Sequence, residues 1–148
     1  MKDKIYPKGT VCIQLFSPEG VLKTEINNLV TNAGLAYIAS RIKGDSGPIS
    51  HMAIGTGTTA QAVTDTTLET ETARVALDST TIVTTNVTDD SVRYTATFGP
   101  GVGTGAITEA GLFDVGTAGI VKCRTVFPVV NKGAADSMVL TWTLGFLN

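Results

Sequence analysis

The chain has 148 residues, of which 43% are hydrophobic and 16% charged, and its 13 acidic and 11 basic residues give a net charge of −2. This length fits a single domain, and the apolar content argues against a disordered chain. The Lys and Arg residues are scattered, which argues against nucleic acid as a partner. The sequence has neither a run of about 18 apolar residues for crossing a membrane nor the apolar stretch of a secretion signal. We therefore expect synthesis in a cytoplasm and no membrane partner.

Threonine is the unusual residue in this composition, with 24 copies. Because threonine is β-branched and favours extended backbone, the composition alone predicts a mainly β protein. The two cysteines, Cys12 and Cys123, lie in separate alternating apolar segments. In a reducing cytoplasm we expect both to stay reduced and to pack as small buried side chains.

The first predicted elements are two strands and a helix. Alternating apolar residues predict a half-buried strand at 10–16, and a turn containing Pro and Gly returns the chain into a strand at 21–26. The apolar spacing then changes to i, i+3, i+4 and i+7, which predicts one short α-helix at about residues 32–42. Thr31 can cap its first turn, and Gly44 can end its last. The apolar positions of this helix are Leu35, Ile38, Ala39 and Ile42.

The rest of the chain has the pattern of short strands joined by turns and loops. A threonine-rich segment at 55–73 and the glycine-rich segment Gly99–Gly105 are expected to be loops. The other strands are predicted at 49–54, 75–77, 80–88, 91–98, 107–113, 120–127 and 138–146. Together these elements predict a mainly β fold, an antiparallel β-sandwich or jelly-roll of about eight strands with one helix. We expect one such domain at residues 10–148, preceded by an N-terminal arm at residues 1–9.

The motifs supply no complete catalytic or metal-binding set. The stretch at 44–48 is similar to part of a serine-protease loop, but the only histidine, His51, follows the serine instead of preceding it. The stretches Gly55–Ala60 and Gly101–Ala106 fit a loose dinucleotide fingerprint, yet neither is followed by a predicted helix that could hold a pyrophosphate. The scattered Cys and His residues do not make a zinc site, and the loop carboxylates match no calcium loop. We therefore expect no enzyme activity, no cofactor and no metal ion.

Glu109 stands out because it lies inside an otherwise apolar predicted strand. A buried carboxylate costs several kcal/mol unless it is paired and hydrogen-bonded. Glu71 and Arg74 flank the entry to another predicted strand, at 75–77. Our hypothesis is that Glu109 is a structural anchor held by Arg74 or by backbone amides of residues 55–60, which pins the long loop against the sheet. The alternative is an exposed glutamate at the edge of the sheet.

Five sequence blocks carry a resemblance to a known class of proteins. Their order resembles that of small virion structural proteins of tailed bacteriophages, and it is similar to the pattern of phage tail-collar fibre proteins, over roughly residues 28–146. The resemblance implies a non-enzymatic virion structural protein with no catalytic residues. The blocks are Asn28-Leu-Val-Thr-Asn-Ala-Gly-Leu35, Ala53-Ile-Gly-Thr-Gly-Thr-Thr-Ala60, Asp65-Thr-Thr-Leu-Glu69 with Arg74, Ile107-Thr-Glu-Ala-Gly-Leu-Phe113, and Thr141-Trp-Thr143.

The chain departs from a fibre protein because it has one predicted globular domain, without a repetitive shaft or a receptor-binding tip. This favours a capsid decoration (cement) protein that binds and stabilises the major capsid protein lattice. A tail collar, fibre-adaptor or adhesin subunit is the alternative, and a small enzyme or an unrelated β binding protein is a third possibility. The expected partners are the major capsid protein or other virion proteins, and further copies of the chain in a dimer or trimer. The expected location is the virion.

The N-terminal arm is the predicted contact with such a partner. It combines positive charge with apolar surface, which suits an acidic capsid surface. The alternative is a frayed terminus without a binding role. The candidate contact residues are Lys4, Tyr6 and Lys8.

Overall fold

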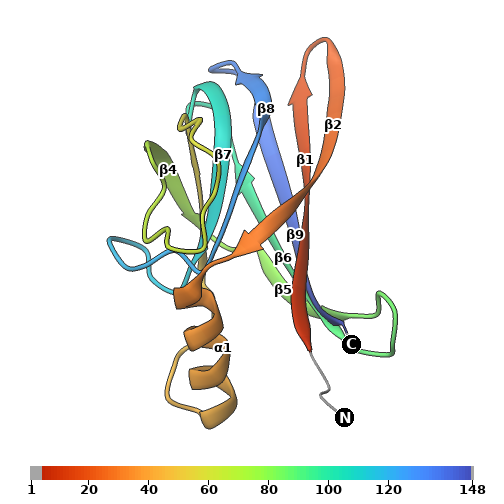
Figure 1. The fold of residues 1–148 in the computed structure, drawn as a ribbon. Helices are drawn as coiled ribbons and strands as arrows, with labels where there is room; N and C mark the ends of the chain where they lie inside the picture. Colours follow the sequence, from red (N-terminus) through yellow and green to blue (C-terminus); the bar gives the residue numbers. More distant parts are fainter. Residues whose placement is uncertain (1–4, 148) are drawn as a thin grey trace.

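The structure is a computed structural model that describes residues 5–147, and within this range it has nine strands and one helix (Figure 1). The predicted mainly β, antiparallel fold with a single helix is confirmed. The helix lies where the apolar spacing predicts it. The elements are β1 (Tyr6–Ser17), β2 (Gly20–Val30), α1 (Asn32–Lys43), β3 (His51–Gly55), β4 (Glu71–Ala76), β5 (Ser79–Val83), β6 (Ser91–Phe98), β7 (Gly105–Phe113), β8 (Cys123–Lys132) and β9 (Ser137–Leu147).

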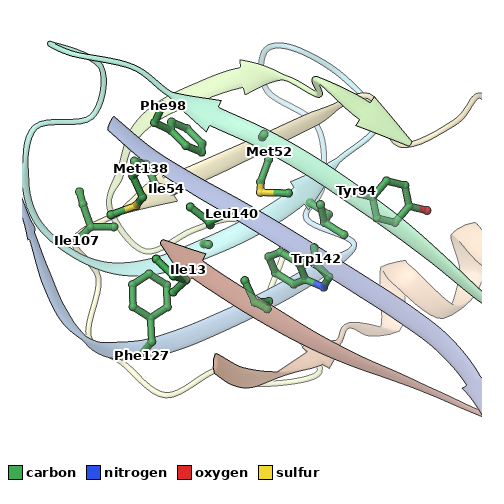
Figure 2. Close-up of a cluster of buried hydrophobic side chains, with 14 of the residues drawn as sticks. Ile13, Met52, Ile54, Tyr94, Phe98, Ile107, Phe127, Met138, Leu140 and Trp142 are labelled. Carbon is green, nitrogen blue, oxygen red and sulfur yellow. The ribbon is translucent and has the colours of Figure 1, made fainter. Parts of the chain in front are cut away.

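The nine strands form one continuous antiparallel sheet in the order β4-β3-β7-β8-β2-β1-β9-β6-β5. Strand β2 joins the two halves of this sheet, because residues 20–28 pair with β1 and only Leu29 and Val30 pair with β8. The sheet curls so that side chains from both halves meet in one core (Figure 2). The two halves therefore face each other as the layers of a sandwich do, while β2 passes from one layer to the other.

Strand β9 shows how the sequence pattern builds this core. Its alternating residues from Met138 to Leu144 all have side chains that are at most 4% exposed, as the period-two pattern predicts. Met52 and Leu112, from the opposite half of the sheet, belong to the same apolar cluster. Burying each large apolar side chain contributes about 1.5–3 kcal/mol to folding. Phe146, the last residue of the alternation, remains 36% exposed at the end of the strand.

The first strand begins earlier than the sequence indicates. Strand β1 starts at Tyr6, so residues 6–9, which were predicted as part of an arm, pair with the end of β9. Pro7 lies in this extension although proline has no N–H to donate to a sheet. Strand β2 pairs with β1 only from Gly9 onward, so Pro7 has a neighbouring strand on one side alone and its missing N–H is tolerated. Residues 1–4 of the predicted arm lie outside the described residues.

Strand β5 is shorter than the predicted strand at 80–88 and ends at Val83. The carboxylate of Asp90 accepts hydrogen bonds from the backbone amides of Thr85, Asn86 and Val87, at 2.8–2.9 Å. These amides hold the pKa of Asp90 well below its usual range. The side chain thus takes donors that a longer strand would use, and the chain turns here instead.

The helix α1 projects from one end of the sheet (Figure 1). Thr31 caps it by accepting a hydrogen bond from the amide of Gly34 at 3.0 Å, and Gly44 ends it in a left-handed conformation, as the sequence predicts. Gly34 is the only residue of the helix that is buried. Two of the apolar positions that predicted the helix are exposed to solvent, Leu35 by 48% and Ile42 by 85%. Within the described part of the chain, the apolar face of α1 is therefore largely uncovered.

Candidate functional site

Glu109, on β7, is completely buried and accepts hydrogen bonds from three backbone amides of the long loop. Its Oε1 accepts from the amides of Gly57 at 3.0 Å and Thr70 at 2.7 Å, and its Oε2 accepts from the amide of Glu69 at 3.0 Å. These three donors come from both ends of the segment at 56–70, which has no strand or helix of its own. One carboxylate thus ties the two ends of the loop to the centre of the sheet.

Arg124, on β8, is the cation that accompanies Glu109. Its Nε donates to Oε2 of Glu109 at 3.0 Å, and its Nη2 lies 2.9 Å from the same oxygen. Its Nη1 donates to Oδ2 of Asp65 at 2.8 Å, and Nη2 donates to the carbonyl of Thr59 at 3.0 Å. Glu69 lies further away, with an oxygen 3.9 Å from Nη2. The buried guanidinium therefore joins the sheet to the middle of the loop as well as to its ends.

Hydrogen bonds shift the pKa values of two members of this network, Arg124 and Glu69. Burial by itself lowers the pKa of Arg124, but the hydrogen bonds that the guanidinium donates to Asp65 and Glu109 raise that pKa above its usual value. The pKa of Glu69 is lowered, chiefly because its carboxylate accepts hydrogen bonds from the amide and hydroxyl of Thr59. Buried charges are tolerated when they are paired and hydrogen-bonded in this way.

Close packing completes the attachment of the loop. A Cβ atom added to Gly57 would lie 2.5 Å from Oε1 of Glu109, so only glycine allows the backbone to approach the carboxylate this closely. The hydroxyl of Thr108 donates to the carbonyl of Gly57 at 2.8 Å. Leu68 is 5% exposed and packs in a small apolar cluster with Phe113 and Val121. The loop is therefore held by charge, by backbone hydrogen bonds and by an apolar anchor.

The predicted anchor is thus found in part. Gly57 is one of the backbone donors in the predicted range, and Glu109 is buried instead of lying exposed at an edge. Arg74 was the other predicted partner and does not contact Glu109. Arg124 takes that position, because Gly111 pairs with Arg124 and Glu109 lies on the same face of β7 two residues away. Arg124 is, like Glu109, a charged residue within a predicted strand, but that strand also contains Lys122, so the sequence alone does not identify Arg124 as the partner.

Arg74 and Glu71 form a separate ion pair on β4. Two hydrogen bonds, of 2.9 and 2.7 Å, connect the guanidinium of Arg74 to the carboxylate of Glu71. The same guanidinium lies 3.6 Å from the ring centre of Phe113 and donates to the carbonyls of Val115 and Ala118. This pair therefore fastens the loop after β7 to strand β4 and does not reach the buried network.

The predicted partner contacts lie at the start of β1. Tyr6 and Lys8 are both exposed, and Lys4 lies outside the described residues. Both exposed residues border a groove of about 740 Å³, which also touches the end of β2 and Leu35 at the start of α1. Two of the predicted contact residues thus lie beside a hollow surface that includes part of the exposed helix.

The buried network has little capacity for catalysis. Both oxygens of Glu109 are occupied by backbone amides and by Arg124, so the carboxylate is not free to act as an acid or base. Residues 5–147 contain no group of three His, Cys, Asp or Glu side chains that could hold a metal ion. Burial raises the pKa of the Cys123 thiol to about 12, which disfavours the reactive thiolate. The contacts of Glu109 and Arg124 position the loop against the sheet.

The described part of the chain also has no helix that is long and apolar enough to cross a membrane. Comparison with known protein families found no match to the sequence. No curated protein and no solved structure matched the chain significantly.

Proposed function

We propose that the chain is a non-enzymatic structural protein of a tailed-bacteriophage virion, and that it binds the major capsid protein lattice as a decoration (cement) protein. The observation that carries this proposal is the placement of apolar side chains on the outside of protruding elements. An apolar side chain in solvent gains free energy when another protein covers it. The most exposed of these side chains are Ile42 on α1, Ile5 before β1, Leu22 on β2, and Ile82 on β5, exposed by 85%, 66%, 66% and 60%.

The sequence blocks behind the resemblance support a structural role. Three of the five blocks supply members of the buried network: Gly57 and Thr59 from the second, Asp65 and Glu69 from the third, and Glu109 from the fourth. The blocks therefore specify a loop that is fastened to a sheet, and not a set of reactive groups. A fixed loop and a stiff sheet suit a protein whose task is to present the same surface repeatedly.

A lattice of identical capsid subunits suits binding through modest contacts. Each copy meets the same local surface, and symmetry multiplies weak contacts into stable attachment. A specific contact of this kind buries about 1,200–2,000 Å² in total. Tyr6 and Lys8 offer an exposed aromatic ring and a positive charge at one edge of the molecule, which fits an acidic capsid surface.

The same motif order favours a second candidate, a tail collar, fibre-adaptor or adhesin subunit, because it is also similar to the pattern of tail-collar fibre proteins. The two candidates differ in copy number. A decoration protein covers the head lattice and is present in many copies, whereas a collar or adaptor surrounds a single tail.

Mass spectrometry of purified phage particles that carry this protein tests the proposal. The ratio of this chain to the major capsid protein is measured against labelled standards of both proteins. A ratio near one copy per capsid subunit, or per fixed group of subunits, is the expected result. A few copies per particle would contradict the capsid decoration role and support the tail collar, fibre-adaptor or adhesin subunit. Absence of the chain from washed particles would contradict both candidates.

A further inference from the structure

The helix α1 is well formed but lacks the contacts that usually stabilise a helix. It has 12 residues, an N-cap at Thr31 and a C-cap at Gly44. Isolated helices of about 12–15 residues are marginal in water, and most helices in proteins gain their stability by packing an apolar face. In α1 only Gly34 is buried, and Tyr37 is the apolar residue that reaches the core. The remaining apolar face needs another surface to cover it.

That face is a narrow apolar stripe along the helix. Leu35 and Ile42 are separated by seven residues, so they lie on the same side of the helix about 10.5 Å apart. Ile38 and Ala39 lie between them, with Ala39 exposed and Ile38 half-buried. The small side chain of Ala39 lets another helix approach closely. The stripe is the kind of surface that packs against a second helix.

A groove lies beside the N-terminal end of the stripe. It measures about 740 Å³, and its apolar lining includes Leu35, Ile5, Tyr6, Leu29 and Val30. The groove is therefore continuous with the stripe through Leu35. At the other end of the stripe, Ile42 protrudes with 85% of its surface exposed. One molecule thus carries both a protruding apolar side chain and a recess, whose lining also includes the polar residues Lys8, Asn28 and Thr85.

We propose that α1 and this groove form the interface of a two-fold homodimer, in which the α1 helices of the two copies pack antiparallel. In that arrangement Ile42 of each copy lies opposite Leu35 of the other and enters the neighbouring groove. The two-fold axis passes between Ile38 and Ala39. Each subunit then contributes the same surface patch to the interface, as two-fold symmetry requires.

Charge favours the antiparallel arrangement over a parallel one. The helix has no acidic residue in its first turn and carries Arg41 and Lys43 in its last turn. Parallel helices would bring these like charges together at one end, whereas antiparallel helices place them at opposite ends. Antiparallel packing also sets the positive end of each helix dipole beside the negative end of the other. A second copy of the chain is thus a suitable occupant only in this orientation.

The area that a dimer must bury explains why the groove belongs to the interface. A helix of 12 residues is about 18 Å long and about 10 Å wide, so contact between two helices alone covers a small footprint. Stable interfaces bury at least about 1,200 Å² in total. The reciprocal contact of each Ile42 with the other copy's groove adds two further contact areas. A dimer would cover Ile42, Ile5 and Tyr6, so it leaves Leu22 as an exposed apolar side chain that can meet a capsid. The dimer is tested by oligomeric state and the virion role by copy number on particles, so the two proposals can fail separately.

Sedimentation equilibrium of the purified chain and of two variants tests the dimer. Ile42→Glu places a charge in the interface, whereas Leu22→Glu places one at a 66% exposed leucine near the turn of the β1–β2 hairpin, which does not line the groove. We expect the wild type and Leu22→Glu to dimerise with similar dissociation constants, and Ile42→Glu to have a dissociation constant at least about tenfold larger. A monomeric or trimeric wild type at about 200 µM would overturn the proposal, since a real interface is populated at such a concentration. Equal weakening by both variants would also overturn it.

Disulfide cross-linking provides a second measurement that does not depend on a disruptive variant. Ala39→Cys lies near the proposed axis, so two copies bring their new thiols close enough to bond. In Ile42→Cys the two thiols lie at opposite ends of the antiparallel pair and are too far apart. Under mild oxidation we expect a cross-linked dimer from Ala39→Cys and none from Ile42→Cys, with the wild type as the control for Cys12 and Cys123. The reverse pattern would contradict the antiparallel arrangement.

Discussion

The loop at 56–70 and the helix α1 differ in how far contacts within the described chain stabilise them. The loop has no regular secondary structure, yet Glu109 and Arg124 hold it through buried charges and backbone hydrogen bonds. The helix is regular and capped at both ends, yet its apolar stripe from Leu35 to Ile42 is largely exposed. Regular backbone is therefore a poor guide to which part of this molecule is fixed by its own chain.

This difference indicates which part of the molecule needs a binding partner. In the loop, the buried polar groups find their partners within the same chain, so the loop requires nothing from outside. In the helix, residues 5–147 supply no stabilising partner for most of the apolar face. We therefore regard the loop as part of the scaffold and the helix as part of an interface.

The largest expected effect comes from removing the buried cation. Arg124→Met leaves the buried carboxylate of Glu109 without its ion pair, and breaking such a pair by removing one member costs about 3–5 kcal/mol in the free energy of unfolding. Urea unfolding of the variant and the wild type measures this loss. The matched control is Lys23→Met, because Lys23 belongs to an exposed pair with Glu25 at 3.3 Å and such pairs contribute at most about 1 kcal/mol. Equal losses in the two variants would remove the distinction between the buried network and the surface.

A smaller loss is expected from filling the space between the loop and Glu109. Gly57→Ala introduces a Cβ that would lie 2.5 Å from the carboxylate and 2.5 Å from Cβ of Glu69, so the loop must shift. Overpacking of this kind costs about 1–3 kcal/mol in the free energy of unfolding. Gly47→Ala is the control, since nothing lies within 4 Å of its added Cβ. If both variants unfold at the same urea concentration, the close approach at Gly57 does not support the loop.

The helix should respond to the loss of its cap. Thr31→Ala removes the acceptor for the amide of Gly34 and the hydroxyl that donates to the carbonyl of Val121 at 2.9 Å. Loss of an N-cap costs about 0.5–2 kcal/mol, and we expect the effect in amide exchange of α1 and in the thermal midpoint. Thr31→Ser keeps the hydroxyl and should stay close to the wild type. If only the amides around Val121 exchange faster in Thr31→Ala, Thr31 stabilises that segment and not the helix.

The smallest effect is a pH dependence that belongs to the loop. The pKa of Glu69 is lower in the folded protein than in the unfolded chain, so its contribution to stability is present above the unfolded value near pH 4.5. That contribution is lost as the pH falls through the folded value. The thermal midpoints of the wild type and Glu69→Gln should therefore differ most near neutral pH and converge as the pH falls through the lowered folded pKa of Glu69. If the difference in thermal midpoint stays constant over this pH range, the charge of Glu69 does not stabilise the loop.

The sequence predicts individual elements better than it predicts what they contact. The alternation in β9 and the helical spacing at 32–42 are visible because burial and backbone periodicity act locally. The anomaly of Glu109 is visible too, because a carboxylate in an apolar strand needs a partner. Its partner Arg124 follows only from the register of β7 and β8, which depends on contacts between distant parts of the chain.

Two further features could not be predicted for different reasons. Backbone amides of residues 55–60 are an expected partner of Glu109, and the amide of Gly57 is one of them. The amides of Glu69 and Thr70 lie outside that range, and a backbone amide has no signature in the sequence that would identify it. The periodicity of α1 indicates which residues share a face, but it does not indicate whether the same chain covers that face. Tyr37 packs toward the core, whereas Leu35 and Ile42 do not.

Amide hydrogen exchange at two protein concentrations tests the contrast between loop and helix most directly. At about 1 µM and about 200 µM, the amides of Gly57, Glu69 and Thr70 should be equally protected, because their acceptor lies in the same chain. The amides of residues 36–43 should exchange faster in the dilute sample, because dilution separates the copies that cover the helix. Helix protection that does not change with concentration, or loop amides that exchange as fast as those of an unfolded peptide, would contradict this account.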